Sequence, residues 1–388
     1  MKRTKEGHLQ QVLGTSDLVL DAWGRQKTIT DFSMFHGMFT FEVPERMWIE
    51  TSDLVEQPFA QFTSFNGMLK CQGLAGVEAR LTSKRHPRYQ PNRGLLYSSS
   101  MILPDVATTA IHDFGMFNHQ SGVFFRTASN VLYAVKRTMV NGVVSEIVEE
   151  ITLPDTIDLS KGNIFDIQMQ WRGVGNMFFY VNQELVHKFK LLGTLDVIST
   201  FNPAMPIGFQ ITGDAVMYCG CADVTSEGGS EENRQRGTAD SEEIALSTAE
   251  IPIILLHFKN TFDYNGVQVI NTRDSVLRRI TGYADVDTII RIYFSRDASK
   301  FTGTTYADND SIGSVEVAFD GDIVLDNLTT NITRSLTRRI EALTSVSIEN
   351  PDSDVGDLFL THGDHILVTM QAKNNTFGGA TIEYGIEI

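Results

Sequence analysis

Hydrophobic and polar residues alternate along much of this chain, most clearly in the segment 163–189, "NIFDIQMQWRGVGNMFFYVNQELVHKF". Its apolar series is Phe165, Ile167, Met169 and Trp171, and its polar series is Asp166, Gln168 and Gln170. A period of two predicts a half-buried β-strand with one apolar face. The turn residues "RGVG" follow, after which Met177–Val181 and Glu184–Phe189 predict two more strands. Because the glycines open a strand and not a helix, no nucleotide-binding loop is predicted in this segment.

Similar patterns predict two strand-rich regions. Residues 45–225 and residues 250–388 both show short alternating runs separated by turn residues, which is typical of β-sandwiches. The polar, glycine-bearing segment 226–249 predicts a linker between them. We therefore expect an all-β fold with two β-sandwich domains of the jelly-roll or concanavalin-like type, the second smaller. One segment of the second region, "TRSLTRRIEAL" at 333–343, has a weak helical pattern.

Residues 1–44 lack sustained alternation and predict an extended N-terminal arm. The arm carries aromatic residues among polar ones, and exposed rings of this kind need a surface to cover them. We expect it to dock on another copy of the chain or on a neighbouring protein. The residues expected to make this contact are Trp23, Arg25, Phe32, Phe35 and Phe39, with Phe41 beside them. Rotational symmetry around a fibre or spike fits such an arm, with a trimer as the first expectation and a dimer as the second.

A basic cluster at 84–94, "KRHPRYQPNRG", predicts a further docking surface. Arg85, Arg88 and Arg93 would meet an acidic surface on a partner. The alternative interpretation is an ordinary surface loop that precedes a strand.

The acidic balance limits the expected partners. The formal net charge is -16 at pH 7, so neither nucleic acid nor anionic lipid is expected to bind, although ordinary solubility also explains the acidity. The N-terminal residues show no signal peptide and no run approaches the roughly 20 apolar residues of a membrane span, so membrane insertion is not expected. Cys71, Cys219 and Cys221 form no disulfide or zinc framework, and neither a metal nor a cofactor is predicted.

Two groups of polar residues are weighed as catalytic or metal sites. In "SEIVEEI", Glu146 and Glu150 share one face of a predicted strand, as the carboxylate pair of a glycoside hydrolase would. Laminarinase-like sandwiches have an aspartate where Val148 stands, so a solvated acidic edge is favoured. The second group is His112, Asp113, Asn118 and His119. It is interpreted as a loop at the end of a sheet and not as a water-activating or metal site.

Polar residues that suit binding occur on the strand described first. Asp166, Gln168 and Gln170 predict a row that lines a carbohydrate-binding face. The alternative is the plain solvent face of a strand, because a sandwich fold alone does not specify a ligand. The pairs Asp308 and Asp310, and Asp320 and Asp322, predict turns at least as well as calcium loops.

Five segments between residues 21 and 229 carry a family resemblance. They are "DAWGRQKTITDFSMF" (21–35), "RYQPNRGLLYSSS" (88–100), "GVFFRTASNVLYAVKRT" (122–138), "IFDIQMQWRGVGNMFFYVNQELVHKF" (164–189) and "CADVTSEGG" (221–229). In this order they resemble a family of virion structural proteins from tailed bacteriophages. The resemblance implies a concanavalin-like lectin sandwich, assembly in the host cytoplasm and a place in the virion. It also implies other capsid or tail proteins as partners.

These observations support three hypotheses. The first is a structural, homo-oligomeric component of a bacteriophage virion, such as a capsid decoration, head fibre or tail-associated subunit, and not an enzyme. The alternative is a glycan-binding adhesin that attaches the virion to a host surface glycan. A glycoside hydrolase acting through Glu146 and Glu150 is the third hypothesis.

Overall fold

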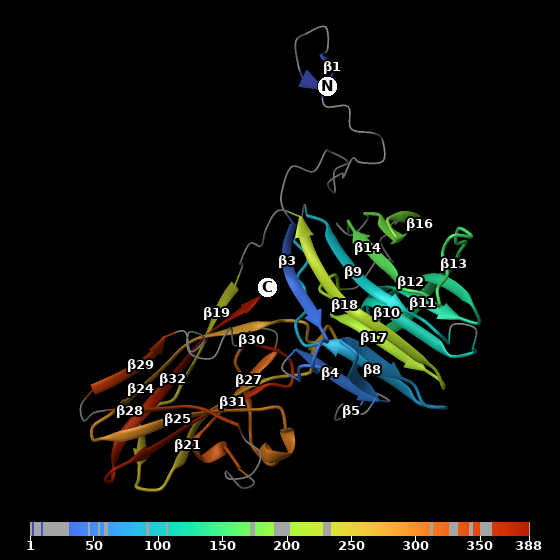
Figure 1. The fold of residues 1–388 in the computed structure, drawn as a ribbon. Helices are drawn as coiled ribbons and strands as arrows, with labels where there is room; N and C mark the ends of the chain where they lie inside the picture. Colours follow the sequence, from blue (N-terminus) through green and yellow to red (C-terminus); the bar gives the residue numbers. More distant parts are fainter. Residues whose placement is uncertain are drawn as a thin grey trace. The chain divides into compact units, whose positions relative to one another are not determined.

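The computed structural model describes residues 2–3, 9–10, 31–45, 47–52, 55–57, 61–90, 93–105, 108–170, 175–189, 202–227, 234–310, 313–325, 333–340, 344–349 and 359–387. In this part of the chain every regular element is a β-strand except two short 3₁₀ segments, η1 (Ala298–Phe301) and η2 (Asp320–Asp322) (Figure 1). The chain divides into two compact units. The first comprises Met1–Ser83 and Pro87–Glu231, and the second comprises Lys84–His86 and Glu232–Ile388. The predicted all-β class is confirmed.

The first unit contains two eight-stranded antiparallel sheets, which we name sheet I and sheet II. Sheet I has the order β13-β12-β11-β10-β17-β8-β4-β5. Its strands are β4 (Trp48–Ser52), β5 (Val55–Gln57), β8 (Glu78–Ser83), β10 (Ile111–Phe117), β11 (Gly122–Ala128), β12 (Val131–Val140), β13 (Val143–Ile151) and β17 (Ile207–Thr212). Sheet II has the order β16-β15-β14-β9-β18-β7-β6, and β3 also pairs with β18. Its strands are β3 (Asp31–Met38), β6 (Phe62–Phe65), β7 (Met68–Gln72), β9 (Leu95–Ile102), β14 (Asn163–Met169), β15 (Met177–Val181), β16 (Glu184–Phe189) and β18 (Val216–Glu227).

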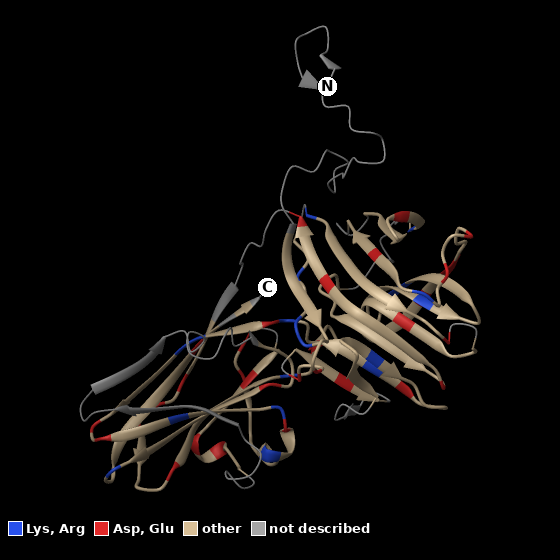
Figure 2. Cartoon of the chain, viewed as in Figure 1, with Lys and Arg blue, Asp and Glu red and all other residues tan. Residues whose placement is uncertain are grey.

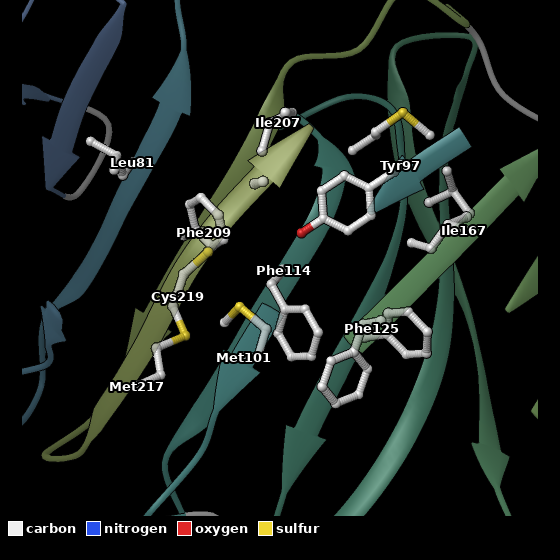
Figure 3. Packing of buried hydrophobic residues seen from close by; sticks show 14 of the residues in the cluster. Leu81, Tyr97, Met101, Phe114, Phe125, Ile167, Ile207, Phe209, Met217 and Cys219 are labelled. Atoms are coloured by element: carbon white, nitrogen blue, oxygen red, sulfur yellow. The ribbon is translucent and has the colours of Figure 1, made fainter. Parts of the chain in front are cut away.

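The core of the first unit lies between these two sheets (Figure 3). Phe165 of β14 meets Phe114 of β10 edge to face, with ring centroids 4.9 Å apart, and Phe125 of β11 at 5.1 Å. Phe165, Ile167 and Met169 are completely buried, as the alternation on β14 predicted. Trp171 lies outside the described residues. The apolar face of each strand therefore faces inward, and its polar face is left for contacts outside the core.

The predicted arm is wrong for its C-terminal part. Asp31–Met38 forms strand β3, which pairs with the Cys221–Glu227 half of β18, while β7 pairs with the other half. Phe35 and Phe39 are buried in the core against Trp48, at 5.4 and 5.2 Å between ring centroids. A register shift at Val224 and Thr225 interrupts the period of two, which explains why no strand was predicted in this segment. Phe32 and Phe41 are exposed, whereas Trp23 and Arg25 lie outside the described residues.

The second unit is a smaller β-sandwich with two six-stranded sheets. One contains β19 (Arg234–Asp240), β20 (Ile244–Leu246), β24 (Ser275–Ala284), β29 (Thr344–Glu349), β30 (Phe359–Leu360) and β32 (Thr376–Glu387). The other has the order β26-β27-β21-β31-β25-β28. Its strands are β21 (Ile251–Phe258), β25 (Thr288–Ser295), β26 (Ala307–Asp308), β27 (Val315–Phe319), β28 (Thr333–Ile340) and β31 (His365–Ala372). Separate two-stranded pairs are β22 (Thr261–Tyr264) with β23 (Val267–Ile270), and β1 (Lys2–Arg3) with β2 (Leu9–Gln10).

Two local predictions for the second half of the chain are wrong. Strand β18 continues to Glu227, and β19 and β20 occupy much of the segment 226–249 that was predicted as a linker. Both strands pair with β32 at the C-terminal end of the sequence, a partner that composition does not reveal. The weakly helical segment at 333–343 contains strand β28, which pairs with β25. Long-range pairing overrides the local pattern in both places.

Candidate functional site

A row of polar side chains crosses five neighbouring strands on the outer face of sheet II. Backbone register places Tyr180 opposite Asp166, Asp166 opposite Ser98, Ser98 opposite Asp223, and Asp223 opposite His36. Because their sequence neighbours point into the core, these five side chains point away from it. We name this set the sheet II row. It contains Asp166, one of the three residues that the sequence predicted for carbohydrate binding.

The two carboxylates of this row lie on either side of one serine. Ser98 Oγ donates a hydrogen bond to Asp166 Oδ1 at 2.6 Å. Burial raises the pKa of the Asp166 carboxyl, against the lowering effect of that hydrogen bond. The pKa of Asp223 is also raised, first by burial and then by the charge of Asp166, while His36 acts in the opposite direction. The two half-buried carboxylates therefore interact, and no lysine or arginine belongs to the row.

The sheet II row keeps hydrogen-bonding capacity that the protein does not use. Within the described part of the chain, no side chain donates a hydrogen bond to Asp223, and no side chain forms a hydrogen bond with the hydroxyl of Tyr180. Burial, followed by the charge of Asp166, raises the pKa of Tyr180, so this hydroxyl is protonated at neutral pH. Half-exposed donors and acceptors of this kind are available to a ligand.

The other predicted residues lie beside this row. Gln168 is half-buried on the same face of β14, opposite Phe178 of β15 and Leu96 of β9. Lys188 Nζ lies 4.9 Å from the centre of the Phe178 ring. Gln170 follows the end of β14, where its backbone N–H donates to the backbone carbonyl of Asn176. The structure thus joins Asp166 and Gln168 to four residues that the sequence analysis did not single out, namely Ser98, Tyr180, Asp223 and His36.

A second polar cluster lies on the outer face of sheet I. Arg126 donates from Nε and Nη2 to the two oxygens of the completely buried Asp113, with both distances at 2.7 Å. Glu146 of β13 accepts from Arg126 Nη1 at 2.8 Å and from Arg137 Nε at 2.9 Å. Arg137 Nη1 donates to the backbone carbonyl of Asn118 at 2.5 Å. Figure 2 shows basic and acidic bands close together in this part of the first unit.

The cluster continues to Arg80 of β8. Arg80 donates from Nε to Gln210 at 2.8 Å, from Nη2 to Glu78 at 3.0 Å, and from Nη1 to the ring of His119 at 2.6 Å. Burial, followed by the charges of Arg80 and Arg137, lowers the pKa of His119 to about 3. The guanidinium groups lie over buried rings, with Arg137 4.9 Å from the centre of Phe124 and Arg80 5.8 Å from that of Phe117. Each nitrogen of these arginines already has a partner, so we assign this network to holding the strands of sheet I together.

One member of the predicted hydrolase pair, Glu146, belongs to this network, where its environment does not suit a general acid. Burial raises the pKa of Glu146, but Arg126 and Arg137 outweigh that effect and hold its pKa below the usual value. A general acid needs a raised pKa. Glu150 lies on the same strand, exposed, opposite Tyr133. Of the residues predicted as a loop, His112 and Asp113 instead lie on strand β10, whereas Asn118 and His119 lie in the segment that follows the strand.

The arginines of the basic cluster at 84–94 are less exposed to solvent than a docking surface requires. Arg85, Arg88 and Arg93 are only partly exposed, and each has an interaction within the chain. Arg93 Nη1 donates to Gln90 Oε1 at 2.8 Å. His86 is buried in the second unit, where its backbone N–H donates to Asp274 Oδ2 at 3.1 Å. These three arginines remain a predicted docking surface without further support.

Two kinds of site are missing from the described residues. No group of three or more histidine, cysteine or acidic side chains there could hold a metal ion. No helix in that part of the chain is long and apolar enough to cross a membrane.

Comparison with known proteins gives matches among solved structures alone. No family model and no curated protein matches this sequence. The endo-1,3-beta-glucanase from Streptomyces sioyaensis is 11% identical over 51% of this chain and 97% of its own, with a TM-score of 0.41. The endo-beta-1,3-glucanase from Pyrococcus furiosus is 13% identical over 51% and 95%, with a TM-score of 0.40. The beta-agarase A from Zobellia galactanivorans is 9% identical over 51% and 92%, with a TM-score of 0.41.

These matches correct one prediction. The sequence analysis expected that the chain is not an enzyme, whereas about half of the chain matches glucanases and an agarase. That expectation is therefore withdrawn. At these identities and TM-scores, no activity, substrate or site residue is carried over from the matched proteins to this chain.

Proposed function

We propose that this chain is a glycan-binding protein and that the outer face of sheet II is its binding surface. The observation that supports it is the sheet II row, in which Asp166, Ser98 and Asp223 lie side by side on three strands. Carboxylates accept hydrogen bonds from sugar hydroxyls, and the hydroxyl of Tyr180 and the amide of Gln168 both donate and accept. A rigid sheet holds these groups at fixed spacing, which lowers the entropy lost on binding.

The contrast between the two sheets favours sheet II. In sheet I, Arg80, Arg126 and Arg137 use their donors inside the protein. In sheet II, Asp223 and Tyr180 keep free polar atoms at a half-exposed surface, and the ring of Phe178 lies one row away. Small-molecule sites combine apolar surface with a few precisely placed polar groups, and this face offers both.

The test is a glycan array followed by calorimetry on the glycans that bind. Asp166→Asn and Asp223→Asn should each weaken binding about tenfold, which corresponds to about 1.4 kcal/mol. Asp155→Asn, in an exposed turn, is the matched control and should bind as the unmodified protein does. Absence of binding to every glycan on the array, or equal affinity for all four proteins, would rule out this surface.

The same samples test for hydrolysis. Reducing ends released from a bound polysaccharide would add an enzymatic activity to binding. Glu146→Gln then decides whether the predicted carboxylate pair is responsible, because the substitution removes the charge that Arg126 and Arg137 hold. Unchanged turnover in this variant would point to other residues.

A second candidate function is a structural subunit of a bacteriophage virion. It is favoured by the ordered set of five sequence segments that resemble such proteins. These segments supply strands to both sheets of the first unit, among them β3, β9, β11, β14 and β18. An adhesin carried on the particle would combine both functions. Peptide mass spectrometry of purified particles from a phage that encodes this chain tests this candidate, and absence from the particles would rule it out.

A further inference from the structure

Strand β13 exposes apolar side chains on both of its faces. Val143 and Ile147 lie on one face and Val144 and Val148 on the other, and their exposed fractions are 68%, 45%, 43% and 45% in that order. The strand is the last in sheet I, so in the described part of the chain β12 alone pairs with it. A row of unpaired backbone groups beside exposed apolar side chains is the site at which another strand adds to a sheet.

The two-sided pattern indicates what kind of partner fits. A globular surface that docks on one face of β13 covers only Val143 and Ile147, or only Val144 and Val148. A strand that pairs with the free edge brings side chains next to both faces at once, because neighbouring residues of a strand point in opposite directions. The partner is therefore an extended strand.

The charges of β13 indicate which kind of strand can pair with its free edge. Its sequence "VVSEIVEEI" contains three glutamates and no basic residue. Glu146 pairs with Arg126 and Arg137, and Glu149 pairs with His187 at 3.2 Å. Glu150 is exposed, and no ion-pair partner for it is found among the described residues. A second β13 would bring like charges together, which is unfavourable between paired strands. A basic strand complements it.

The same chain contains such a strand at another sheet edge. β28 reads "TRSLTRRI", with Arg334, Arg338 and Arg339 and no acidic residue. It pairs with β25 on one side and is the last strand of its sheet in the described part of the chain. Its length of 8 residues is close to the 9 residues of β13. Length, edge position and charge therefore all match.

We infer that β13 of one copy pairs with β28 of a second copy and joins sheet I to a sheet of the neighbour's second unit. Each copy has one acidic and one basic edge, so the contact joins two different strands. Two copies that make it reciprocally form a two-fold dimer, and copies that make it in sequence form closed rings or open fibres. This gives the chain a self-assembly surface that depends neither on glycan binding nor on the predicted N-terminal arm.

The experiment is sedimentation velocity and light scattering on the full chain from about 1 to 100 μM, a range that spans typical weak interfaces. The unmodified protein should form dimers or larger assemblies, and these should weaken at high salt because exposed charges are screened. Glu150→Arg, and separately the double variant Arg338→Glu and Arg339→Glu, should each raise the dissociation constant about tenfold, or about 1.4 kcal/mol.

A charge swap separates this pairing from general damage. The triple variant with Glu150→Arg, Arg338→Glu and Arg339→Glu should recover assembly, because each edge again meets the opposite charge. Leu74→Lys, at an exposed turn outside β13, should assemble as the unmodified protein does. A protein that stays monomeric at 100 μM, about the upper limit of the range, overturns the inference. Variants that assemble like the unmodified protein, or a triple variant that does not recover, overturn it as well.

Discussion

Arg126 binds both carboxylate oxygens of Asp113, with two N–O distances of 2.7 Å, across neighbouring strands of sheet I. Burial raises the pKa of Asp113, while the hydrogen bonds and charge of Arg126 oppose that effect. Asp113→Ala leaves Nε and Nη2 of Arg126 without acceptors, while Glu146 still pairs with Nη1. We expect the substitution to lower the free energy of unfolding by about 1 to 3 kcal/mol, the cost of buried donors left unsatisfied.

Urea unfolding followed by fluorescence and circular dichroism measures this loss. Asp155→Ala, at an exposed turn, is the control and should change stability by less than about 0.5 kcal/mol. If Asp113→Ala matched its control, the network on sheet I would not contribute to holding the sheet together.

The two faces of β14 should respond differently to truncation. Phe165 is completely buried between Phe114 and Phe125, whereas 46% of the neighbouring Ile164 is exposed. Phe165→Ala should cost about 3 to 5 kcal/mol because it leaves a cavity. Ile164→Ala should cost less than about 0.5 kcal/mol, because its side chain is largely in water. Similar losses from the two substitutions in denaturant titrations would contradict the inward orientation of Phe165 on β14.

Gly115 of β10 is required by the close approach of β11. A Cβ atom at this position would lie 2.6 Å from Phe124 Cα and 2.8 Å from the carbonyl oxygen of Val123, and its φ is +153°. Backbone atoms cannot move aside as a flexible side chain can, so Gly115→Ala should cost about 1 to 3 kcal/mol. Gly162→Ala is the matched control, because nothing lies within 4 Å of its added Cβ. A thermal midpoint for Gly115→Ala equal to that of Gly162→Ala would show that the strands tolerate the extra atom.

The strands of sheet II were predictable where the alternation is regular. Phe165, Ile167 and Met169 follow a strict period of two and were assigned to the correct face. Strand β3 was not predicted, because Met34 and Phe35 are neighbours in the sequence and are both buried at a register shift. Local sequence cannot show that the edge of β18 is open to receive it.

The composition of the candidate site was only partly predictable for a related reason. Asp166 was found because its own strand is regular, but Ser98, its hydrogen-bond partner, lies 68 positions earlier in the chain. Arg80 and Gln210 of sheet I are 130 positions apart. Which strands are neighbours, and in which register, depends on packing between sheets, and a single sequence does not record it.

Acid should destabilise the first unit through His112. This side chain is completely buried on β10, its Nδ1 lies 3.0 Å from Thr127 Oγ1, and its Nε2 has no hydrogen-bond partner. Burial lowers the pKa of His112 to about 4, although the charge of Asp105 opposes the shift. The folded protein therefore holds His112 neutral at pH values where the unfolded chain, with a pKa near about 6.5, binds a proton.

Because of this difference in proton binding, the free energy of unfolding falls as the pH falls. The contribution of His112 is complete above a pH of about 6.5 and is lost as the pH falls from there towards about 4, with a slope of up to about 1.4 kcal/mol per pH unit. His119 and His365, whose pKa values burial lowers to about 3, act in the same direction. Burial raises the pKa values of Asp166 and Asp223, so these carboxyls act in the opposite direction and favour the folded state at low pH. A variant that changes His112 alone is needed to isolate its contribution.

His112→Asn removes the titrating group and keeps a polar side chain of similar size. The difference in unfolding free energy between the unmodified protein and this variant should shrink steadily as the pH falls through the window where the unfolded histidine, with its pKa of about 6.5, takes up a proton. Thr63→Asn, at an exposed position without a titratable side chain, is the control and should leave the slope unchanged. Urea titrations at several pH values between about 7.5 and 5 cover this window. A constant difference across the series would mean that His112 takes up its proton equally well in the folded protein, and that its burial does not make the fold acid-sensitive.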